Sequence, residues 1–233
     1  REIICTKKSK IMDKEDKKKK SAEKAYEIIK KDLNRDTVLG IGTGTTTNYF
    51  IEIINNENLD VKGAVCSSDA SKELLSSSNI EILSLNDVYK IDFYIDGADE
   101  FNSRKELIKG GGGALTREKI LAHFSQTFIC IVDDSKYSDL LGNFPVPIEV
   151  IELARSAISR EIMKIGGKPV YRNNFITDNG NQIIDVHHLD LKVPYEMEQL
   201  INSIPGVVEN GIFSHRKADI ILKSSNERVD ILN

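Results

Sequence analysis

The chain has 233 residues, of which 40% are apolar, and a formal net charge of -4 at pH 7. A core of ordinary size can form without disulfides or structural metal, and general nucleic-acid binding is disfavoured because it needs a basic surface. No stretch approaches the roughly 18 apolar residues of a membrane span, and the three cysteines have neither disulfide-framework nor zinc-site spacing, so we expect a cytoplasmic protein with reduced thiols at Cys5, Cys66 and Cys130.

The first half of the chain alternates helical and extended patterns. Residues 21–33 have a helical period, and the apolar run 37–41 predicts a strand that leads into a turn rich in glycine and threonine. A helix around residues 49–54 and a strand over 61–66 complete a βαβ unit, which implies a parallel sheet. The pattern then continues with a helix from about residue 70, strands over 80–83 and 91–95, a helix over 115–124 and a strand over 127–132. We therefore predict an open, doubly wound, Rossmann-like α/β domain.

The pattern changes from Pro145 onward. We expect an edge strand over 146–150, a helix over 154–165, paired short strands about the Asn179-Gly180 turn, a helix over 194–201 and a strand near Val207. The run 218–222 again resembles a buried strand, which indicates that the chain returns to the first sheet. These patterns predict a larger α/β domain formed by residues 1–146 and 218–233, and a smaller ferredoxin-like α+β domain formed by residues 147–217.

The segment Gly40-Ile-Gly-Thr-Gly-Thr-Thr-Thr47 lies between a predicted strand and a predicted helix. It does not match the dinucleotide fingerprint GxGxxG, because in either register a threonine replaces the third glycine. Hydroxyl groups beside glycines at a helix N-terminus favour a compact dianion, held by backbone N–H groups and the helix dipole. The functional interpretation is a phosphate site, and the alternative is a glycine turn whose threonine merely caps the helix.

The segment Asp96-Gly-Ala-Asp-Glu100 follows the apolar run 93–95, so its acids stand at the carboxyl end of a strand, where open α/β sheets bind ligands. Three carboxylates within five residues could bind a divalent metal, or could serve proton transfer and hydroxyl recognition. A polar turn with a capping aspartate is the alternative.

The run Lys109-Gly-Gly-Gly-Gly-Ala-Leu-Thr-Arg-Glu-Lys119 is the most informative segment. Four consecutive glycines let the backbone approach a ligand closely, at a cost in conformational entropy. Lys109 offers a cation for a developing oxyanion, and Glu118 offers a base. The helix dipole would depress the pKa of Glu118, so burial or a neighbouring acid must raise it if this residue is to work near neutral pH. A surface helix carboxylate, or a partner for Lys119, is the alternative role for Glu118.

The remaining polar segments are less specific. Asp133-Asp-Ser-Lys136 follows a strand, so Lys136 could bind phosphate or could lie in a solvated turn. The histidines have no ligand spacing, so we expect no zinc site and take as structural or exposed His123, His187, His188 and His215.

Taken in order, these segments and three others resemble type A ribose-5-phosphate isomerase from about Ala25 to the C-terminus. The lysine–tetraglycine run is the most specific of the motifs, and the three others are Ser67-Ser-Asp-Ala-Ser71, Thr177-Asp-Asn-Gly180 and Pro205-Gly-Val-Val-Glu-Asn-Gly211.

The resemblance implies an aldose–ketose isomerase of the non-oxidative pentose phosphate pathway, a homodimer or homotetramer that works through an enediolate without cofactor or metal. It places the catalytic base on Glu118, assisted in ring opening, proton transfer and oxygen stabilisation by Asp96, Asp99 and Lys109. It places substrate contacts on Thr43, Gly44, Thr45, Thr46, Gly111, Gly112 and Lys136. A family lysine near the N-terminus could correspond to Lys18, but the surrounding lysine run leaves this alignment open.

Two rival functions have distinct sequence requirements. A deaminase or lactonase acting on sugar phosphates would be expected to have a histidine near the active acids, and the motifs place none there. A sugar-phosphate-sensing regulator would carry a helix-turn-helix before the phosphate loop, and the lysine-rich residues ahead of Gly40 do not resemble one.

Overall fold

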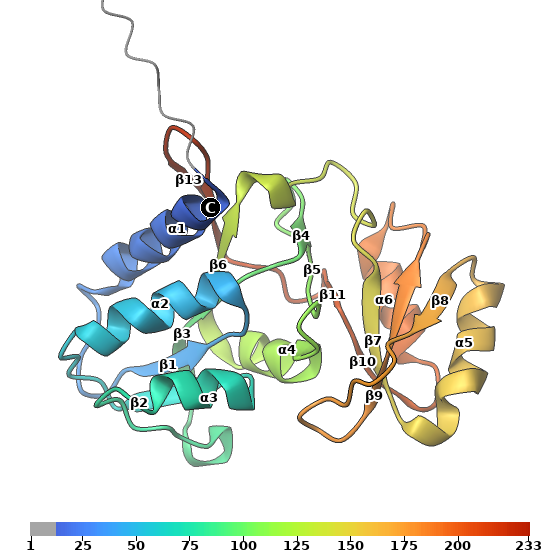
Figure 1. The fold of residues 1–233 in the computed structure, drawn as a ribbon, viewed down its shortest axis with the longest axis horizontal. Helices are drawn as coiled ribbons and strands as arrows, with labels where there is room; N and C mark the ends of the chain where they lie inside the picture. Colours follow the sequence, from blue (N-terminus) through green and yellow to red (C-terminus); the bar gives the residue numbers. More distant parts are fainter. Residues whose placement is uncertain (1–12) are drawn as a thin grey trace, which may run out of the picture.

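The computed structural model describes residues 13–233, and its largest sheet has six strands (Figure 1). In spatial order they are β13 (Val229–Leu232), β12 (Ile220–Ser224), β6 (Ser125–Asp133), β3 (Ile91–Asp96), β1 (Val38–Ile41) and β2 (Gly63–Cys66). All neighbours are parallel except β13, which is antiparallel to β12. Strand β12 pairs with β6, which confirms the predicted return of the chain to the first sheet.

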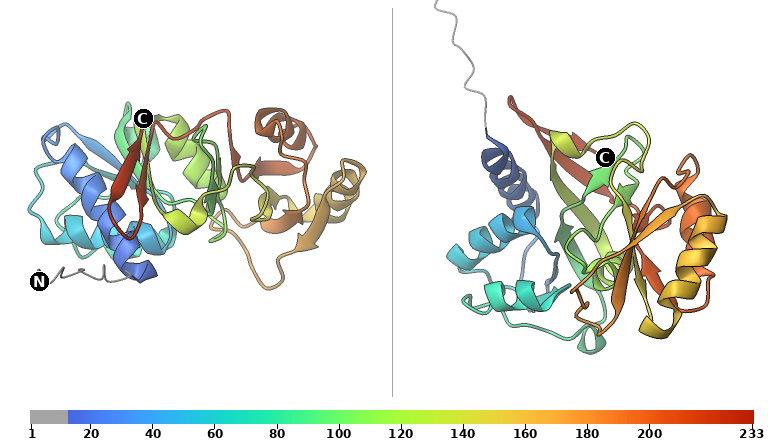
Figure 2. Two further views of the ribbon diagram at one scale, coloured as in Figure 1. Left: turned by 90° about the horizontal axis from the view of Figure 1, so that it is seen from above. Right: turned by 45° about the vertical axis from the view of Figure 1, so that its right-hand side comes forward.

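Helices cover both faces of this sheet (Figure 2). On one face lie α1 (Lys14–Ile29), α2 (Thr45–Asn56) and α3 (Asp69–Leu75), whose apolar side chains form one buried cluster with Ile95, Ile129 and Ile131. On the other face, α4 (Leu115–His123) packs in a second cluster that contains Tyr94 and Phe128. Successive residues of β3 and β6 thus point to opposite faces, as a strand requires. The predicted doubly wound arrangement is confirmed.

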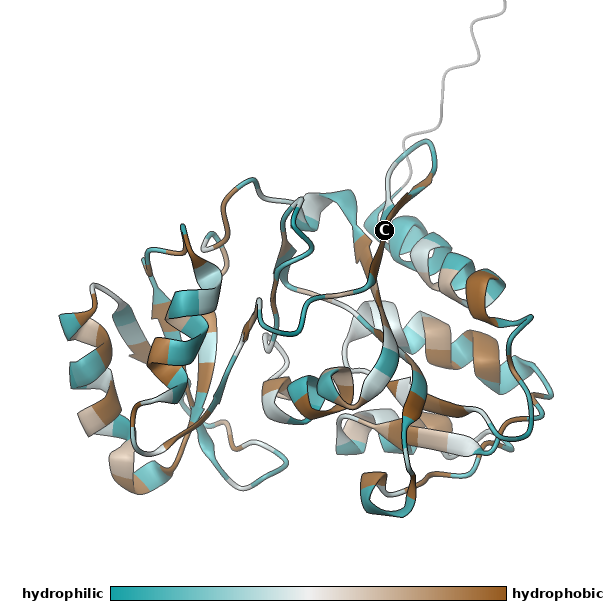
Figure 3. Cartoon of the chain, turned by 180° about the vertical axis from the view of Figure 1, so that it is seen from behind, coloured by the Kyte–Doolittle hydropathy of each residue, from teal (hydrophilic) through white to brown (hydrophobic). Residues whose placement is uncertain are grey.

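Helix α1 begins earlier and ends earlier than the predicted range 21–33. The side chain of Asp13 accepts a hydrogen bond from the Asp16 backbone N–H at 2.8 Å, which caps the helix and lets the lysine run form its first turns. The helix ends at Ile29, and residues 30–32 form a turn. Figure 3 shows bands of polar and apolar residues alternating along the helices, as is expected when one face packs against a sheet.

The strand expected over residues 80–83 is wrong. Ile82 makes one isolated parallel bridge with Ala64, supported by hydrogen bonds from Ala64 N to Glu81 O and from Leu83 N to Ala64 O. The chain then turns into the short helix η1 (Leu85–Asp87). Local apolar character was present, but the segment does not run beside β2 for long enough to form a ladder.

The smaller unit has the order β7 (Val146–Val150), α5 (Arg155–Lys164), β8 (Lys168–Tyr171), β9 (Gln182–His187), α6 (Pro194–Asn202) and β10 (Val207–Asn210). A short helix, η3 (Glu152–Ala154), precedes α5. The strands form an antiparallel sheet in the order β10-β7-β9-β8. This βαββαβ arrangement is ferredoxin-like, as predicted.

Strand β7 is not the edge strand that its proline indicated, because it lies between β10 and β9. The register explains how Pro147 is accommodated. Pairing with β10 ends at Ile148, and beyond that point the carbonyl of Pro147 accepts a hydrogen bond from Gly211 N at 2.8 Å. The N–H that proline lacks would point to the same side as this carbonyl, past the end of β10, so the ladder loses no bond there.

A third, three-stranded antiparallel sheet connects the two units. It consists of β11 (Ile212–Phe213), β5 (Leu107–Ile108) and β4 (Glu100–Phe101). Ile108 and Ile212 also belong to the apolar cluster of the smaller unit. The division of the chain at residues 147–217 stays a prediction. Among residues 13–233, no helix is both long and apolar enough to cross a membrane.

Candidate active site

The candidate site lies where the winding of the large sheet changes direction. Strands β1 and β3 are neighbours, and the helices that follow them along the chain, α2 and α4, cover opposite faces. The loops after two such strands diverge and leave a crevice at their carboxyl ends. Here those loops are residues 42–44 and 97–99.

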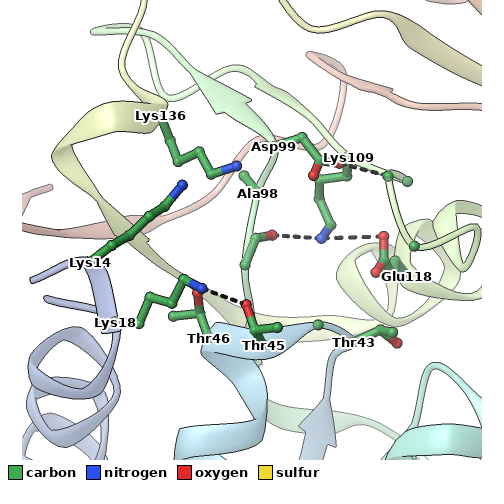
Figure 4. Close-up of a pocket in the computed structure, with 15 residues that line it drawn as sticks. Lys14, Lys18, Thr43, Thr45, Thr46, Ala98, Asp99, Lys109, Glu118 and Lys136 are labelled. Carbon is green, nitrogen blue, oxygen red and sulfur yellow. Dashed lines mark hydrogen bonds and ion pairs between the residues drawn. The ribbon is translucent and has the colours of Figure 1, made fainter. Parts of the chain in front are cut away.

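Figure 4 shows the pocket in this crevice. Ten of the eleven predicted site residues line it, and Asp96 is the exception. The lining residues are Lys14, Lys18, Thr43, Gly44, Thr45, Thr46, Gly97, Ala98, Asp99, Lys109, Gly110, Gly111, Gly112, Glu118 and Lys136. The structure therefore brings together segments that are widely separated in the sequence.

One end of the pocket is suited to a phosphate group. Gly44 precedes α2 with a φ of 113°, which only glycine adopts readily, and no side chain caps the first turn of the helix. The N–H groups of that turn, together with the helix dipole, favour an anion. Figure 4 shows the ammonium groups of Lys14, Lys18 and Lys136 pointing toward this end of the pocket.

Lys18 belongs to this group although the sequence left its alignment open. Its Nζ donates to Thr45 Oγ1 at 2.9 Å and to Glu15 Oε1 at 2.7 Å, and only 9% of the residue is exposed. A signal was present in the sequence, because Lys18 lies on the same helical stripe as Ala22, Ala25 and Ile29, all of which are buried. A lysine on an apolar stripe has its charged end directed to a specific partner.

Lys136 lies in a short helix, η2 (Asp134–Lys136), directly after β6. The side chain of Asp133 accepts a hydrogen bond from Ser135 N at 2.9 Å and so fixes the start of the turn. Asp134 in turn binds Lys17 Nζ at 2.8 Å, which connects this turn to α1. The two lysine-bearing segments on either side of the pocket are thereby held together.

Asp96 lies beneath the pocket and is fully buried. Its Oδ1 accepts hydrogen bonds from Thr43 N at 3.0 Å and Gly97 N at 2.7 Å, and its Oδ2 accepts one from the Tyr94 hydroxyl and lies 2.9 Å from Lys109 Nζ. A Cβ atom at Gly42 would lie 2.0 Å from the Asp96 carboxyl carbon. Asp96 thus holds the loop at Thr43 and the side chain of Lys109 in place, and its predicted part in catalysis stays a prediction.

Lys109 and Glu118 face each other in the pocket. The Lys109 ammonium donates to Gly97 O at 2.6 Å and lies 3.3 Å from Glu118 Oε2. Burial alone would lower the pKa of Lys109, but the Asp96 and Glu118 carboxylates outweigh it and raise that pKa above its ordinary value. Lys109 is therefore a permanent cation at the centre of the site.

Glu118 is the carboxyl whose environment fits a base. Burial raises its pKa from 4.5 to about 8 against the attraction of Lys109, and the charges of Asp96 and Asp99 add to the increase. Beyond its ion pair with Lys109, Glu118 Oε2 has no hydrogen-bond partner among residues 13–233. The burial and neighbouring acids that the sequence argument required are both present, so the helix dipole does not decide the pKa.

The tetraglycine run forms the wall between Lys109 and α4. Gly110 and Gly113 have φ values of 103° and 86°, and a Cβ atom at Gly111 would lie 2.7 Å from Asp99 Oδ1. Gly111 N donates to Asp99 Oδ2 at 2.7 Å, whereas Gly112 N donates to no acceptor in the part of the chain that the structure describes. The wall therefore presents an available backbone donor to the pocket.

The next residue on α4, Lys119, connects the helix to the smaller unit. Its Nζ lies 2.9 Å from both Glu198 Oε1 and Glu209 Oε1 and donates to Ile212 O at 2.7 Å. Both acids belong to the smaller unit, on α6 and β10. The alternative partnership of Glu118 with Lys119 is therefore wrong, because Lys119 has these other partners.

The four histidines lie outside the pocket, and three of them, His123, His188 and His215, are exposed. Cys66 and Cys130 are free, buried core residues, and burial raises their pKa values to about 11 and about 12. Cys5 lies outside the described residues. Among residues 13–233, no group of three or more histidine, cysteine, aspartate or glutamate side chains is arranged to hold a metal ion.

Comparisons with known proteins agree with the geometry. Residues 63–227 match the family model described as ribose 5-phosphate isomerase A (phosphoriboisomerase A). A ribose 5 phosphate isomerase A structure from Neisseria gonorrhoeae is 44% identical, with a TM-score of 0.91 over 96% of this chain and 98% of that one. The enzyme from Methanocaldococcus jannaschii is 38% identical, with a TM-score of 0.87 and coverage of 94% and 99%.

A D-ribose-5-phosphate isomerase in complex with phospho-erythronic acid is also similar. It is 41% identical, with a TM-score of 0.89 over 95% of this chain and 100% of that one. Identity of this level over nearly the whole of both chains, together with the family model, shows that the chain belongs to the ribose 5-phosphate isomerase A family.

Proposed function

We propose that this protein interconverts D-ribose 5-phosphate and D-ribulose 5-phosphate through an enediolate. The observation that carries the proposal is a buried carboxyl, Glu118, whose pKa is raised to about 8 and which lies 3.3 Å from a buried ammonium in a pocket with a phosphate-binding end. A base with a pKa close to the working pH is suited to both removing and returning a proton.

Glu118 is the proposed proton carrier. Its carboxylate takes the proton from C2 of the open-chain aldose, leaving an enediolate across C1 and C2, and returns that proton to C1. The ketose forms when the proton of the C2 hydroxyl also passes to O1, so that O2 becomes the carbonyl oxygen. In the reverse reaction Glu118 takes the proton from C1 and returns it to C2. A single group that faces both carbons completes the transfer between the carbons, and the hydroxyl proton is moved separately.

The charge that develops on the sugar oxygens requires donors that are already in position. Lys109 supplies a permanent cation beside Glu118, and Gly112 supplies an available N–H group on the pocket wall. Asp99 lines the same pocket, where we assign it to ring opening and to the movement of the hydroxyl protons. Asp96 acts by holding Lys109 and the Thr43 loop.

The phosphate group is proposed to bind at the start of α2. The contacts expected from the sequence are Thr43, Gly44, Thr45, Thr46 and Lys136. We add Lys14 and Lys18, because they line the same pocket. Binding energy from this distant group helps to hold the reacting end of the sugar in place. We infer that phospho-erythronic acid, present in the similar complex, also binds here, because its carboxylate resembles the charged, planar enediolate.

The test is formation of ribulose 5-phosphate from ribose 5-phosphate by purified protein treated with EDTA, alongside Glu118→Gln. We expect activity to survive chelation and to vanish in the variant, with substrate binding largely retained. Glu152→Gln is a matched control, because Glu152 is exposed in η3. A Glu118→Gln variant of near wild-type rate would exclude Glu118 as the base, and a wild type that binds substrate without turnover would favour a sensor.

We further propose that the protein acts in the cytoplasm, in the non-oxidative pentose phosphate pathway, as a homodimer or homotetramer that binds no nucleic acid. The free thiols of Cys66 and Cys130 support a reducing compartment. The net charge of -4 supports the absence of nucleic-acid binding. Light scattering of the purified protein at micromolar concentration distinguishes the two assemblies from a monomer.

A further inference from the structure

A segment of the smaller unit reaches the tetraglycine wall from outside the pocket. Arg172, which directly follows β8, donates from Nη1 to Gly110 O at 3.3 Å and to Gly111 O at 3.2 Å. Its Nη2 also approaches Gly110 O at 3.4 Å. Arg172 is not among the pocket-lining residues, so its guanidinium contacts the glycine peptides without lining the pocket.

The guanidinium is itself held firmly. Asp185 on β9 accepts from Arg172 Nε at 2.8 Å and from Nη2 at 2.5 Å, a two-point contact that fixes the plane of the group. The guanidinium also lies 5.3 Å from the centre of the Phe175 ring. That ring packs on Gly113 so closely that a Cβ atom there would lie 2.1 Å from Phe175 Cζ. The outer face of the tetraglycine run is thus covered from the smaller unit.

These contacts determine which way the glycine N–H groups point. In a trans peptide unit the C=O of one residue and the N–H of the next point in opposite directions. The carbonyl of Gly110 is directed to Arg172, and the N–H of Gly111 is accordingly directed to Asp99 Oδ2 at 2.7 Å. The carbonyl of Gly111 is also directed to Arg172, so the N–H of Gly112 is directed to the pocket.

We propose that Arg172 is a positioning residue for the isomerisation: by holding the carbonyls of Gly110 and Gly111, it aims the Gly112 N–H at the oxygen that becomes charged in the enediolate. This rests on the proposed function. Glycine peptides rotate easily, because no Cβ atom restricts them, and a tetraglycine run without an outside anchor would sample many orientations. Arg172 contacts the peptide backbone, and the residues that line the pocket contact the substrate.

The experiment compares Arg172→Lys and Arg172→Ala with Arg155→Lys. Arg155 is the matched control, because its guanidinium stacks on an aromatic ring of the same unit, 4.1 Å from the centre of Tyr171, and does not line the pocket. Lysine keeps the charge but lacks the planar fork that can bind Asp185 and two carbonyls together. We measure kcat, KM, the inhibition constant of phospho-erythronic acid and the thermal unfolding midpoint.

For both Arg172 variants we expect kcat to fall by about 10 to 100-fold, the scale of a misplaced reacting or stabilising group. KM for ribose 5-phosphate stays within about twofold, because the phosphate site is untouched, whereas inhibition by phospho-erythronic acid weakens in proportion to kcat. Millimolar guanidinium restores part of the rate to Arg172→Ala only. Arg155→Lys retains wild-type kinetics.

Wild-type kcat in Arg172→Lys overturns the inference while leaving the proposed function intact. A loss of rate that matches a loss of folded protein and that guanidinium does not restore overturns it as well, because Arg172 then supports only the fold. An inactive wild-type protein counts against the proposed function itself, so failure of the two ideas can be told apart.

Discussion

The ammonium of Lys109 lies 3.3 Å from the carboxylate of Glu118, and both side chains are almost completely buried. Removing two charges from water has a large energetic cost, which their attraction offsets only partly. The same ammonium also binds Asp96 at 2.9 Å, so one cation is shared by two acids. Asp96 also accepts hydrogen bonds from two backbone N–H groups. Glu118 Oε2 has no further partner among residues 13–233, and burial raises the pKa of Glu118 to about 8.

The first prediction concerns the pH dependence of activity. Because the pKa of Glu118 is raised to about 8 and the base must be ionised, kcat/KM should rise with pH up to about 8. The substrate phosphate ionises near pH 6, and this ionisation should give a separate limb of the pH–activity profile at lower pH. Asp99→Asn removes one of the charges that raise this pKa, so its limb should shift to lower pH. A wild-type limb near pH 4.5 would contradict the assignment.

The second prediction concerns stability. The ordinary pKa of a glutamate is 4.5, and burial raises that of Glu118 to about 8 in the folded protein. Between pH 4.5 and pH 8 the folded state therefore binds more protons than the unfolded state. The contribution of Glu118 to stability is lost as pH rises from about 4.5 to about 8. The change in the free energy of unfolding that Glu118→Gln causes should therefore differ between the two pH values. It should be more favourable at pH 8 than at pH 5 by on the order of a few kcal/mol. Urea unfolding at both pH values measures the difference, and an effect that is the same at pH 5 and pH 8 would argue against it.

The third prediction separates two lysines of the same helix. Lys18→Met should raise KM for ribose 5-phosphate by about tenfold or more, since a cation at the phosphate end contributes at least about 1.4 kcal/mol. Lys24 lies about 1.7 turns further along α1. It pairs with Glu27 at the surface, so Lys24→Met should leave KM unchanged. Equal KM values for the two variants would remove Lys18 from the site. The effect of Lys18→Met should shrink at high salt.

The fourth prediction concerns two glycines with different surroundings. A Cβ atom at Gly42 would lie 2.0 Å from the carboxyl carbon of Asp96, so Gly42→Ala must displace a buried carboxylate and should destabilise the fold by about 3 kcal/mol or more. At Gly112 the nearest neighbour, Thr43 Cγ2, is 3.9 Å away, and Gly112→Ala should leave the unfolding midpoint within about 1 °C. Denaturant unfolding of Gly42→Ala and thermal unfolding of both variants test the contrast.

Sequence reasoning located the strand ends because each motif follows an apolar run, and in a parallel sheet such ends meet at one edge. This argument predicts that Thr43, Asp99 and Lys136 lie at one edge of the sheet, and all three line the pocket. Glu118, which the family resemblance identifies as the base, lines the same pocket. It also identified burial as the condition for a useful pKa at Glu118, and the structure meets that condition.

What the sequence could not predict depends on contacts between distant segments. Pro147 indicated an edge strand, and only the register with β10 shows why an inner strand accepts it. Arg172 has no local pattern that sets it apart from Arg155, because its partners are carbonyls 61 and 62 residues away along the chain. Asp96 appeared equivalent to Asp99 until packing placed one beneath the pocket and the other in its wall.

Glu118 and Lys119 are consecutive residues of α4, yet one is directed to Lys109 and the other to two acids of the smaller unit. Successive side chains on a helix diverge by about 100°. The ion pairs of Glu118 and Lys119 therefore hold α4 from two different sides and restrict rotation of the helix about its axis. The contact between α4 and the smaller unit is thus made by the residue next to the carboxylate proposed to carry the proton.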